Sequence, residues 1–237
     1  MAVEPDIELH YWPTPNGWKV SILLEELAVP YRLVPVDIRK GAQFAPEFLA
    51  ISPNNRIPAI VDCKPADGGA PLPVFETAAI LQYLAEKYGA LLPHDTRRKY
   101  EVLQWVAWQV AGLGPTAGQV HHFLEYADEQ VPYAIRRFTR EIERLYGVLD
   151  ARLEGRAFIC GEYSIADIAC WTWSRLWKHH RIELARFPHL GRWLAAVGAR
   201  PAVNKGFRIG NELREGQPTM TKEARSVLLD QGARPRE

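Results

Sequence analysis

The sequence predicts two domains of different class, a small α/β domain followed by a domain built only of helices. Residues 7–88 alternate short apolar runs with helical stretches, whereas residues 96–208 have a helical pattern throughout. Between them, Leu92–Thr96 contains a proline and an aspartate, which typically interrupt regular structure. We therefore place the domains at residues 6–90 and 96–210, with a polar tail at 211–237.

The first domain is expected to follow the order βαβαββα. Its strands are apolar or alternating runs bounded by turn residues, at 7–12, 30–36, 57–62 and 72–76. Helices are expected at about 16–28 and 77–88, with a shorter one within 40–49. Asp67, Gly68 and Gly69 provide a turn for a hairpin between the last two strands.

The second domain contains one long amphipathic helix and two helices with clear starting signals. Ser164 is a typical N-cap, and Asp167 can return a hydrogen bond to it. Pro188 suits the first turn of another helix. Beyond residue 210 the composition is polar, and we expect a mobile tail with one short helix at 222–229. The long helix is indicated by apolar residues three or four apart: Ile135, Phe138, Ile142, Leu145, Leu149 and Leu153.

Composition excludes several classes of protein. The chain has 237 residues, 47% of them hydrophobic, and a formal charge of +1, so no overall charge favours binding to nucleic acid or an anionic membrane. No apolar run approaches the roughly 20 residues that span a bilayer, and no secretory leader is recognisable. Cys63, Cys160 and Cys170 are too few and too widely spaced for a disulfide framework or zinc site, which favours the cytoplasm.

The turn between the first strand and the first helix is the first place where chemistry could occur. The start of the helix exposes free N–H groups and the positive end of its dipole, which favour a thiolate or another anion. Thr14 and Asn16 add a hydroxyl and an amide as hydrogen-bond donors. The simpler interpretation is that both are turn and cap residues.

Two further places follow along the chain. The Ile57–Pro58 bond is a possible cis peptide that would turn the Ile57 backbone outward, toward an extended peptide ligand; a trans proline at a strand start is the alternative. At residues 75–78 a strand runs into a helix, where Thr77 could bind a carboxylate and Glu76 could neutralise a nearby amino group. Thr77 could also simply cap its own helix.

Together, these features resemble the glutathione transferases, over roughly residues 7–208. The likeness is greatest to the bacterial nu class, which also resembles the globular part of the yeast nitrogen-regulating prion protein. It implies a thioredoxin-like first domain, an all-helical second domain and a homodimer. The segments that carry it are PTPNG at 13–17, ISPNNRIPAI at 51–60, PADGG at 65–69 and WQVAGLGP at 108–115.

The resemblance implies roles for residues of the first domain. Thr14 and Asn16 would stand beside the sulfur of bound glutathione. Gln43, Arg56 and the Ile57 backbone would hold its glycyl and cysteinyl parts. The ligand would be one or two glutathione molecules, or glutathione disulfide, without a metal.

The resemblance also assigns the other end of the ligand. Glu76 and Thr77 would hold the γ-glutamyl part; relatives often have serine where this chain has Thr77, and both carry a hydroxyl. Arg137 would bind a carboxylate of a second glutathione, in the fork geometry that suits arginine. Gln104 could complete the γ-glutamyl site across the dimer interface.

These roles lead to a hypothesis about the reaction. No cysteine lies at residues 12–18, so the reactive sulfur would come from the ligand. We expect a glutathione-dependent reductase of small disulfides, in which one bound thiolate attacks and a second glutathione completes the exchange. The alternatives are conjugation of glutathione to electrophiles and a non-catalytic glutathione-binding module.

The remaining histidines and cysteines are given structural interpretations. The pairs at 121–122 and 179–180 lack carboxylates at ligand spacing, so we expect surface or cleft histidines rather than a metal site. Cys63 is expected to be exposed, and Cys160 and Cys170 to be buried.

Overall fold

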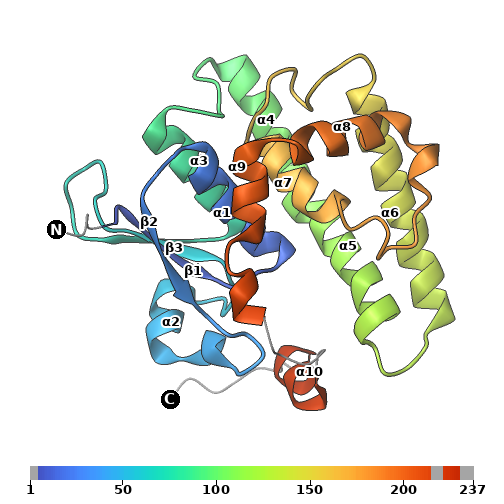
Figure 1. Cartoon of the computed structure of the whole chain (residues 1–237), viewed down its shortest axis with the longest axis horizontal. Helices are drawn as coiled ribbons and strands as arrows, with labels where there is room; N and C mark the ends of the chain where they lie inside the picture. Colours follow the sequence, from blue (N-terminus) through green and yellow to red (C-terminus); the bar gives the residue numbers. More distant parts are fainter. Residues whose placement is uncertain (1–4, 215–220, 230–237) are drawn as a thin grey trace.

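The computed structural model describes residues 5–214 and 221–229, and it contains a sheet with flanking helices beside a helical region (Figure 1). The order βαβαββα is confirmed, as is the helical second region. The first region comprises β1 (Ile7–Tyr11), α1 (Pro15–Glu26), β2 (Tyr31–Pro35), the 3-10 turn η1 (Ala42–Phe44), α2 (Pro46–Ile51), β3 (Ala59–Asp62), β4 (Leu72–Phe75) and α3 (Thr77–Tyr88). The second comprises α4 (Thr96–Trp108), η2 (Gln109–Leu113), α5 (Gly114–His121), η3 (His122–Tyr126), α6 (Pro132–Leu153), α7 (Ile165–Ser174), η4 (Leu184–Arg186), α8 (Pro188–Gly198), α9 (Pro201–Arg208), η5 (Asn211–Arg214) and α10 (Lys222–Leu229).

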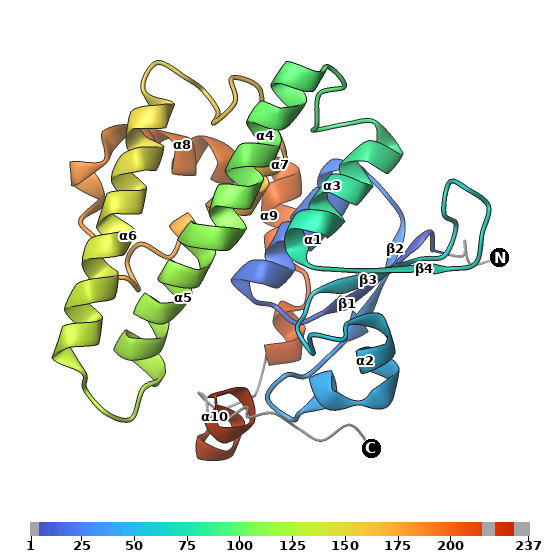
Figure 2. The same ribbon diagram turned by 180° about the vertical axis from the view of Figure 1, so that it is seen from behind.

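The four strands form one mixed sheet in the order β2-β1-β3-β4. β1 pairs in parallel with β2, with Leu9 opposite Leu33, and antiparallel with β3, with Leu9 opposite Ile60. α1 and α3 lie on one side of the sheet and α2 on the other (Figures 1 and 2). Leu9 and Ile60 are fully buried, because helices cover both faces of the central strands.

The start of α7 has the hydrogen bonds that its sequence predicts. Ser164 caps the helix, and the Asp167 carboxylate accepts from the Ser164 N–H at 3.0 Å. The same carboxylate accepts from the Ile159 N–H at 3.0 Å and the Trp193 indole at 2.8 Å. Asp167 is fully buried, and these bonds compensate the cost of removing its carboxylate from water. The capping box therefore also joins α7 to α8.

α9 returns to pack directly on α1. A Cβ atom on Gly206 would lie 2.5 Å from the Ile22 Cα, so only glycine allows the two backbones to approach this closely. The Ser21 hydroxyl donates to the Gly206 carbonyl at 2.7 Å, and the Tyr11 hydroxyl donates to the Ile209 carbonyl at 2.9 Å. The last part of the helical region thus buries the helix that follows β1.

The predicted tail contains the predicted helix. α10 spans Lys222–Leu229, and Arg225 forms an ion pair with Asp128 at 2.6 Å. Residues 215–220 and 230–237 of that tail lie outside the described residues. Among the helices that the structure describes, none has both the length and the apolar character needed to cross a membrane.

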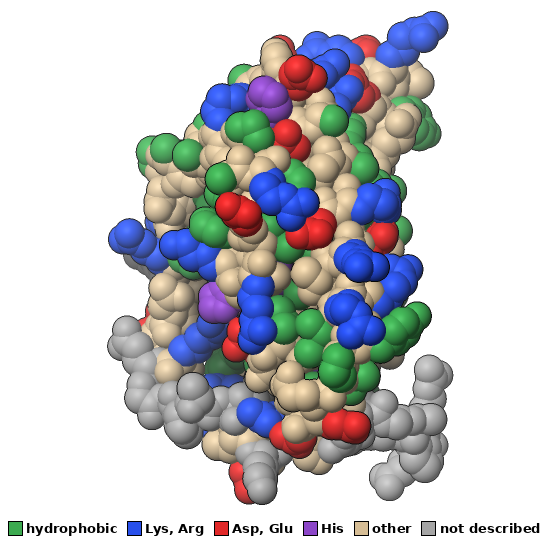
Figure 3. Space-filling view, turned by 90° about the vertical axis from the view of Figure 1, so that its right-hand side faces the viewer, with side chains coloured by type: hydrophobic (Ala, Val, Ile, Leu, Met, Phe, Trp, Pro, Cys, Tyr) green, Lys and Arg blue, Asp and Glu red, His purple; other side chains and the backbone are tan. Residues whose placement is uncertain are grey.

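Charges of both signs are mixed on the side of the molecule that includes α6. Figure 3 shows Lys and Arg side chains there interspersed with Asp and Glu. Residues of α6 form ion pairs: Arg144 lies 2.6 Å from Glu141, and Glu143 lies 2.7 Å from Arg186. Pairing of this kind divides the surface into small regions of alternating sign.

Candidate functional site

A cleft of about 260 Å³ lies where the start of α1, the segment before β3 and the start of α3 converge. The structure brings Asn16, Arg56, Ile57 and the Glu76–Thr77 junction together there, although they are up to 61 positions apart in sequence. The residues that line the cleft are Asn16, Ser52, Asn54, Arg56, Ile57, Pro58, Glu76 and Thr77. Ser52 and Asn54 were not predicted as site residues.

The start of α1 is held by a cap and by a close backbone approach. Thr14 is the N-cap, and its hydroxyl oxygen accepts from the Gly17 N–H at 3.2 Å. A Cβ on Gly17 would lie 2.3 Å from the Trp12 carbonyl oxygen, so the turn requires glycine. The cap interpretation of Thr14 is therefore correct, and a hydroxyl that accepts one bond still has a proton to donate. Thr14 itself is not among the residues that line the cleft.

The segment before β3 presents backbone to the cleft. The Ile57–Pro58 peptide is cis, as the sequence suggested. The Ser52 hydroxyl donates to the Arg56 carbonyl at 3.0 Å, which secures the preceding turn. In the part of the chain that the structure describes, the Ile57 N–H makes no hydrogen bond, so it is available to a ligand.

The junction between β4 and α3 has the features of an anion site. The first N–H groups of a helix have no helical partner, and the dipole makes this end positive. The Glu76 backbone has a φ of +69°, a conformation that residues other than glycine rarely adopt and that is energetically costly. The Asn54 amide donates to the Glu76 carboxylate at 3.2 Å, and both residues line the cleft. The positive helix start suits a ligand carboxylate, and the negative Glu76 side chain suits an amino group beside it.

Lys19 lies behind the junction, and the sequence interpretation missed it. Its side chain is 1% exposed, and its ammonium donates to the Thr77 hydroxyl oxygen at 3.2 Å. Burial lowers the pKa of Lys19 to about 7, although the nearby Cys170 and Glu76 oppose the shift. The sequence contained one signal of this position: Lys19 stands among the apolar residues of α1. A charged residue at such a place is unusual in a helix that is buried on all faces.

Besides Thr14, three residues named from the resemblance lie outside the cleft wall. Gln43 is buried, and its amide donates to the Ile38 carbonyl at 3.1 Å. Arg137 is exposed on α6, with its guanidinium 3.9 Å from Glu141. Gln104 is exposed on α4. Their predicted roles remain predictions.

The three cysteine thiols are free and lie away from the described cleft wall. Burial raises the pKa of all three, that of Cys160 to about 12 and that of Cys170 well above its usual value. Cys170 is buried as expected, but Cys160 and Cys63 are both half-buried, so the expectations of a buried Cys160 and an exposed Cys63 were wrong. Thiols with raised pKa values contain little thiolate at neutral pH.

Three of the histidines in the helical region lie close to one another. The His121 ring lies 5.8 Å from that of His179 and 6.3 Å from that of His180. His180 is fully buried against the Tyr146 hydroxyl at 3.2 Å, so the expectation of a surface or cleft position was wrong for it. Burial lowers the pKa of His180 to about 3. Among the described residues, no group of His, Cys, Asp and Glu has the arrangement of metal ligands.

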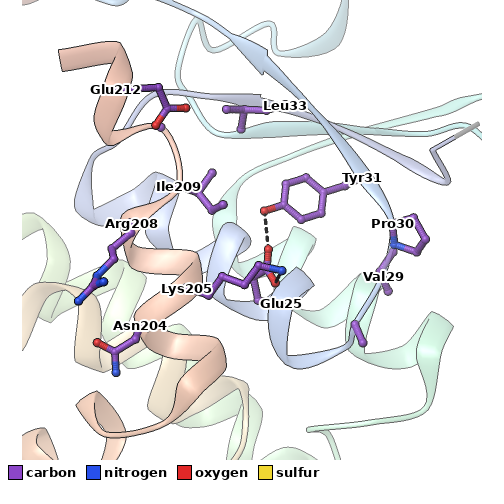
Figure 4. A pocket seen from close by; sticks show the side chains of 12 residues that line it. Glu25, Val29, Pro30, Tyr31, Leu33, Asn204, Lys205, Arg208, Ile209 and Glu212 are labelled. Atoms are coloured by element: carbon purple, nitrogen blue, oxygen red, sulfur yellow. Dashed lines mark hydrogen bonds and ion pairs between the residues drawn. The ribbon is translucent and has the colours of Figure 1, made fainter. Parts of the chain in front are cut away.

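A larger cavity of about 1080 Å³ lies elsewhere, between the end of α1, β2 and α9 (Figure 4). Glu25 accepts from the Tyr31 hydroxyl at 2.9 Å and pairs with Lys205 at 2.7 Å. Its walls share no residue with the smaller cleft. Charged residues of both signs line it, with Lys205 and Arg208 beside Glu25 and Glu212, whereas the smaller cleft combines a helix start with the Ile57 backbone.

The chain is similar to glutathione transferases and to disulfide-bond oxidoreductases. The family model for the glutathione S-transferase N-terminal domain matches residues 14–87. The disulfide-bond oxidoreductase YfcG of Escherichia coli is 53% identical over 210 residues, covering 87% of this chain and 98% of that protein. The disulfide-bond oxidoreductase YghU of the same organism is 37% identical, covering 84% of this chain and 73% of that protein.

Solved structures share the fold over most of the chain. A glutathione transferase from Burkholderia graminis with two glutathione molecules bound per subunit superposes with a TM-score of 0.83 at 43% identity, covering 88% of this chain and 90% of that one. A glutathione transferase from Pseudomonas putida with one glutathione disulfide bound per subunit gives 0.84 at 42% identity, covering 88% and 94%. Ure2p in complex with S-hexylglutathione gives 0.80 at 30% identity, covering 86% and 99%.

Proposed function

The chain belongs to the glutathione transferase family, and on that basis we propose that it is a glutathione-dependent disulfide-bond oxidoreductase. Glutathione is the reducing substrate and supplies the reactive thiolate. In the overall exchange two glutathione thiols are oxidised and leave as glutathione disulfide, while the substrate disulfide is reduced to two thiols. The two protons lost by glutathione are taken up by the products.

The observation that carries this proposal is the separation of the cleft from the chain's own thiols. The cleft has donors at the start of α1 and an anion site at the start of α3, whereas the cysteines lie outside its described wall and hold their protons tightly. A helix start favours an anion such as a thiolate, by roughly 0.3–2 kcal/mol from the dipole alone. Thiol–disulfide exchange proceeds through the thiolate, so even this modest preference increases the rate.

We assign the predicted site residues as follows. Thr14 and Asn16 act beside the sulfur, and Arg56 with the Ile57 backbone holds the glycyl and cysteinyl parts. Gln43, whose buried side-chain oxygen has no partner among the described residues, is assigned to the same part of the ligand.

Glu76 and Thr77 receive the α-amino and α-carboxylate groups of the γ-glutamyl part. Arg137 receives a second glutathione. These assignments are supported by the convergence of Asn16, Arg56, Ile57, Glu76 and Thr77 on one cleft and by the solved relatives that hold glutathione.

We further propose a homodimer of the nu class acting in the cytoplasm. The exposed Gln104 on α4 is free to complete the partner's γ-glutamyl site. Cysteines left as free thiols suit a reducing compartment. Sedimentation of the purified chain tests the dimer directly.

The enzymatic test is reduction of hydroxyethyl disulfide by glutathione, with glutathione reductase and NADPH reporting the glutathione disulfide formed. We expect turnover by the wild type and loss of most of it in Asn16→Ala. A strong rate with chlorodinitrobenzene and a negligible disulfide rate would instead assign the protein to conjugation. Tight glutathione binding without turnover of either substrate would make it a binding module.

A further inference from the structure

The Lys19 ammonium is placed in an unusual way for a charged group. α1 and α3 run side by side (Figure 2), and Lys19 extends from the middle of α1 to the first residue of α3. Its side chain is 1% exposed, and its one described partner is the Thr77 hydroxyl at 3.2 Å. No carboxylate among the described residues lies within ion-pair distance of it. A buried charge without a counter-ion is costly, so a neighbouring ligand group is the natural source of compensation.

The groups that face Lys19 do not provide a counter-ion. On α7 the facing group is the Cys170 thiol, which stays protonated because burial raises its pKa. Before α3 it is Glu76, whose carboxylate accepts from the Asn54 amide rather than from Lys19. α9 also packs on α1, but its Lys205 pairs with Glu25.

The direction of the hydrogen bond between Lys19 and Thr77 depends on the charge of the amine. An ammonium has only donors, so the Thr77 oxygen must accept from it and the hydroxyl proton remains free for the cleft. A neutral amine has a lone pair and can accept that proton instead. Thr77 lines the cleft, so the charged amine leaves its hydroxyl able to donate to a ligand carboxylate.

We propose that Lys19 is a positioning residue that directs the Thr77 hydroxyl toward the ligand carboxylate, and that its charge couples glutathione binding to the uptake of one proton. The inference rests on the proposed function, because it takes the γ-glutamyl carboxylate as the group bound at α3. Chains of hydrogen bonds strengthen one another in a low-dielectric interior, so the ammonium polarises the hydroxyl that meets the carboxylate.

The coupling has a defined sign. Burial holds the pKa of Lys19 at about 7 without ligand, so the amine loses its charge as the pH rises above neutral. A bound carboxylate favours the charged form, and binding above that pH must therefore draw a proton from solution. With one linked proton, the affinity for the ligand falls by about tenfold for each pH unit above the pKa that Lys19 has in the ligand-free protein.

The test is calorimetric titration of the full chain with S-methylglutathione, whose sulfur cannot ionise. Titrations at pH 6 to 8.5 in buffers of different ionisation enthalpy give both the dissociation constant and the proton uptake. For the wild type we expect uptake that rises toward one proton above pH 7. Lys19→Met should lose this uptake, bind about tenfold more weakly at pH 6 and show no pH dependence from this source. Lys19→Arg, whose charge is permanent, should take up no proton and should keep, from pH 6 to 8.5, the affinity that the wild type shows at pH 6.

The matched control is Lys205→Met, which removes an exposed lysine paired to the same helix and should retain the wild-type dependence of affinity and proton uptake on pH.

Thermal unfolding without ligand is a second measurement. Lys19→Met should melt at or above the wild-type temperature, because it removes an uncompensated buried charge. If Lys19 had a purely structural role, the variant would melt at a lower temperature than the wild type. If Lys19→Met does not fold, the inference is tested by comparing the proton uptake of the wild type with that of Lys19→Arg. Wild-type proton uptake in Lys19→Met would overturn the inference while leaving the proposed function intact. Absence of binding by the wild type at every pH would overturn both.

Discussion

The Asn16 side-chain oxygen accepts a hydrogen bond from the Trp173 indole at 3.0 Å, which joins the start of α1 to α7. An indole nitrogen only donates, so this bond determines which end of the Asn16 amide is the oxygen. Asn16 lines the cleft, and its amide nitrogen has no hydrogen-bond acceptor among the described residues, so its two N–H groups can donate to a ligand. A residue of the helical region therefore orients the donor that we assign to the glutathione sulfur.

Trp173→Phe is expected to lower turnover without removing glutathione binding. The substitution keeps an aromatic ring but loses one hydrogen bond, worth about 1 kcal/mol, and the rate should fall about fivefold. The hydroxyethyl disulfide assay gives the rate, and calorimetry with S-methylglutathione gives the affinity. Trp177→Phe is the control, because Trp177 makes no described contact with Asn16. An unchanged rate in Trp173→Phe would mean that the indole does not orient Asn16.

Removal of all three cysteines is expected to leave catalysis intact. Their raised pKa values and their absence from the described cleft wall make them poor nucleophiles for the substrate. The combined Cys63→Ser, Cys160→Ser and Cys170→Ala variant should keep kcat/KM within about twofold of wild type. Mass spectrometry during turnover provides the second measurement. A mixed disulfide between the chain and glutathione that forms and decays at the rate of turnover would contradict the mechanism.

Asp62 is expected to stabilise the fold in a pH-dependent way. Burial alone would raise the pKa of its carboxyl, but hydrogen bonds from Lys87, Tyr83 and the Lys64 backbone outweigh that effect and lower it. The stabilisation is therefore present above the unfolded-state pKa of about 3.9 and is lost as the pH falls through the lower folded-state value. Asp62→Asn should lose about 3 kcal/mol at pH 7, and the loss should shrink on acidification.

Urea unfolding at pH 7 and at pH 3 measures this difference. Asp6→Asn is the matched control, since Asp6 forms an exposed pair with Lys64 at 2.8 Å and should contribute no more than about 1 kcal/mol. An Asp62→Asn variant whose loss of stability is the same at both pH values would show that the charge of Asp62 is not the source of its effect.

Arg137→Ala is expected to weaken the second glutathione and spare the first. Arg137 is exposed on α6, and its distance of 3.9 Å from Glu141 indicates a weak ion pair that a ligand carboxylate could replace. The rate should need about tenfold more glutathione to saturate, which is the contribution of one charge-assisted bond. Arg136→Ala, the neighbouring substitution, should behave as wild type. Equal effects of the two substitutions would indicate a general charge effect rather than a binding site.

Features decided by local sequence were predicted correctly. Helix α3 begins at Thr77 and the capping box forms at Ser164 and Asp167, because each depends on a few neighbouring residues. The meeting of the three segments at the cleft was inferred from family resemblance, and the structure confirms their convergence.

Features that depend on distant partners were not predicted. Lys19 is buried because α3, α7 and α9 all cover α1; its place among the apolar residues of α1 was a signal, but that signal does not say which elements cover it. His180 was misplaced for the same reason, since its partner Tyr146 lies 34 positions earlier. Gln43 and Arg137 were assigned by resemblance alone; the described partners of their side chains, Ile38 and Glu141, are local and do not test the assigned roles.

The close fit of Gly206 against Ile22 has a practical consequence for protein engineering. A fragment truncated at the inter-region segment would expose the apolar side of α1 to water, and with it the scaffold that orients Asn16 and Thr77. Attempts to produce a minimal reductase from the thioredoxin-like part alone must therefore redesign that surface or retain the terminal helices. Circular permutation, which keeps both surfaces in one polypeptide, is the safer route to new termini.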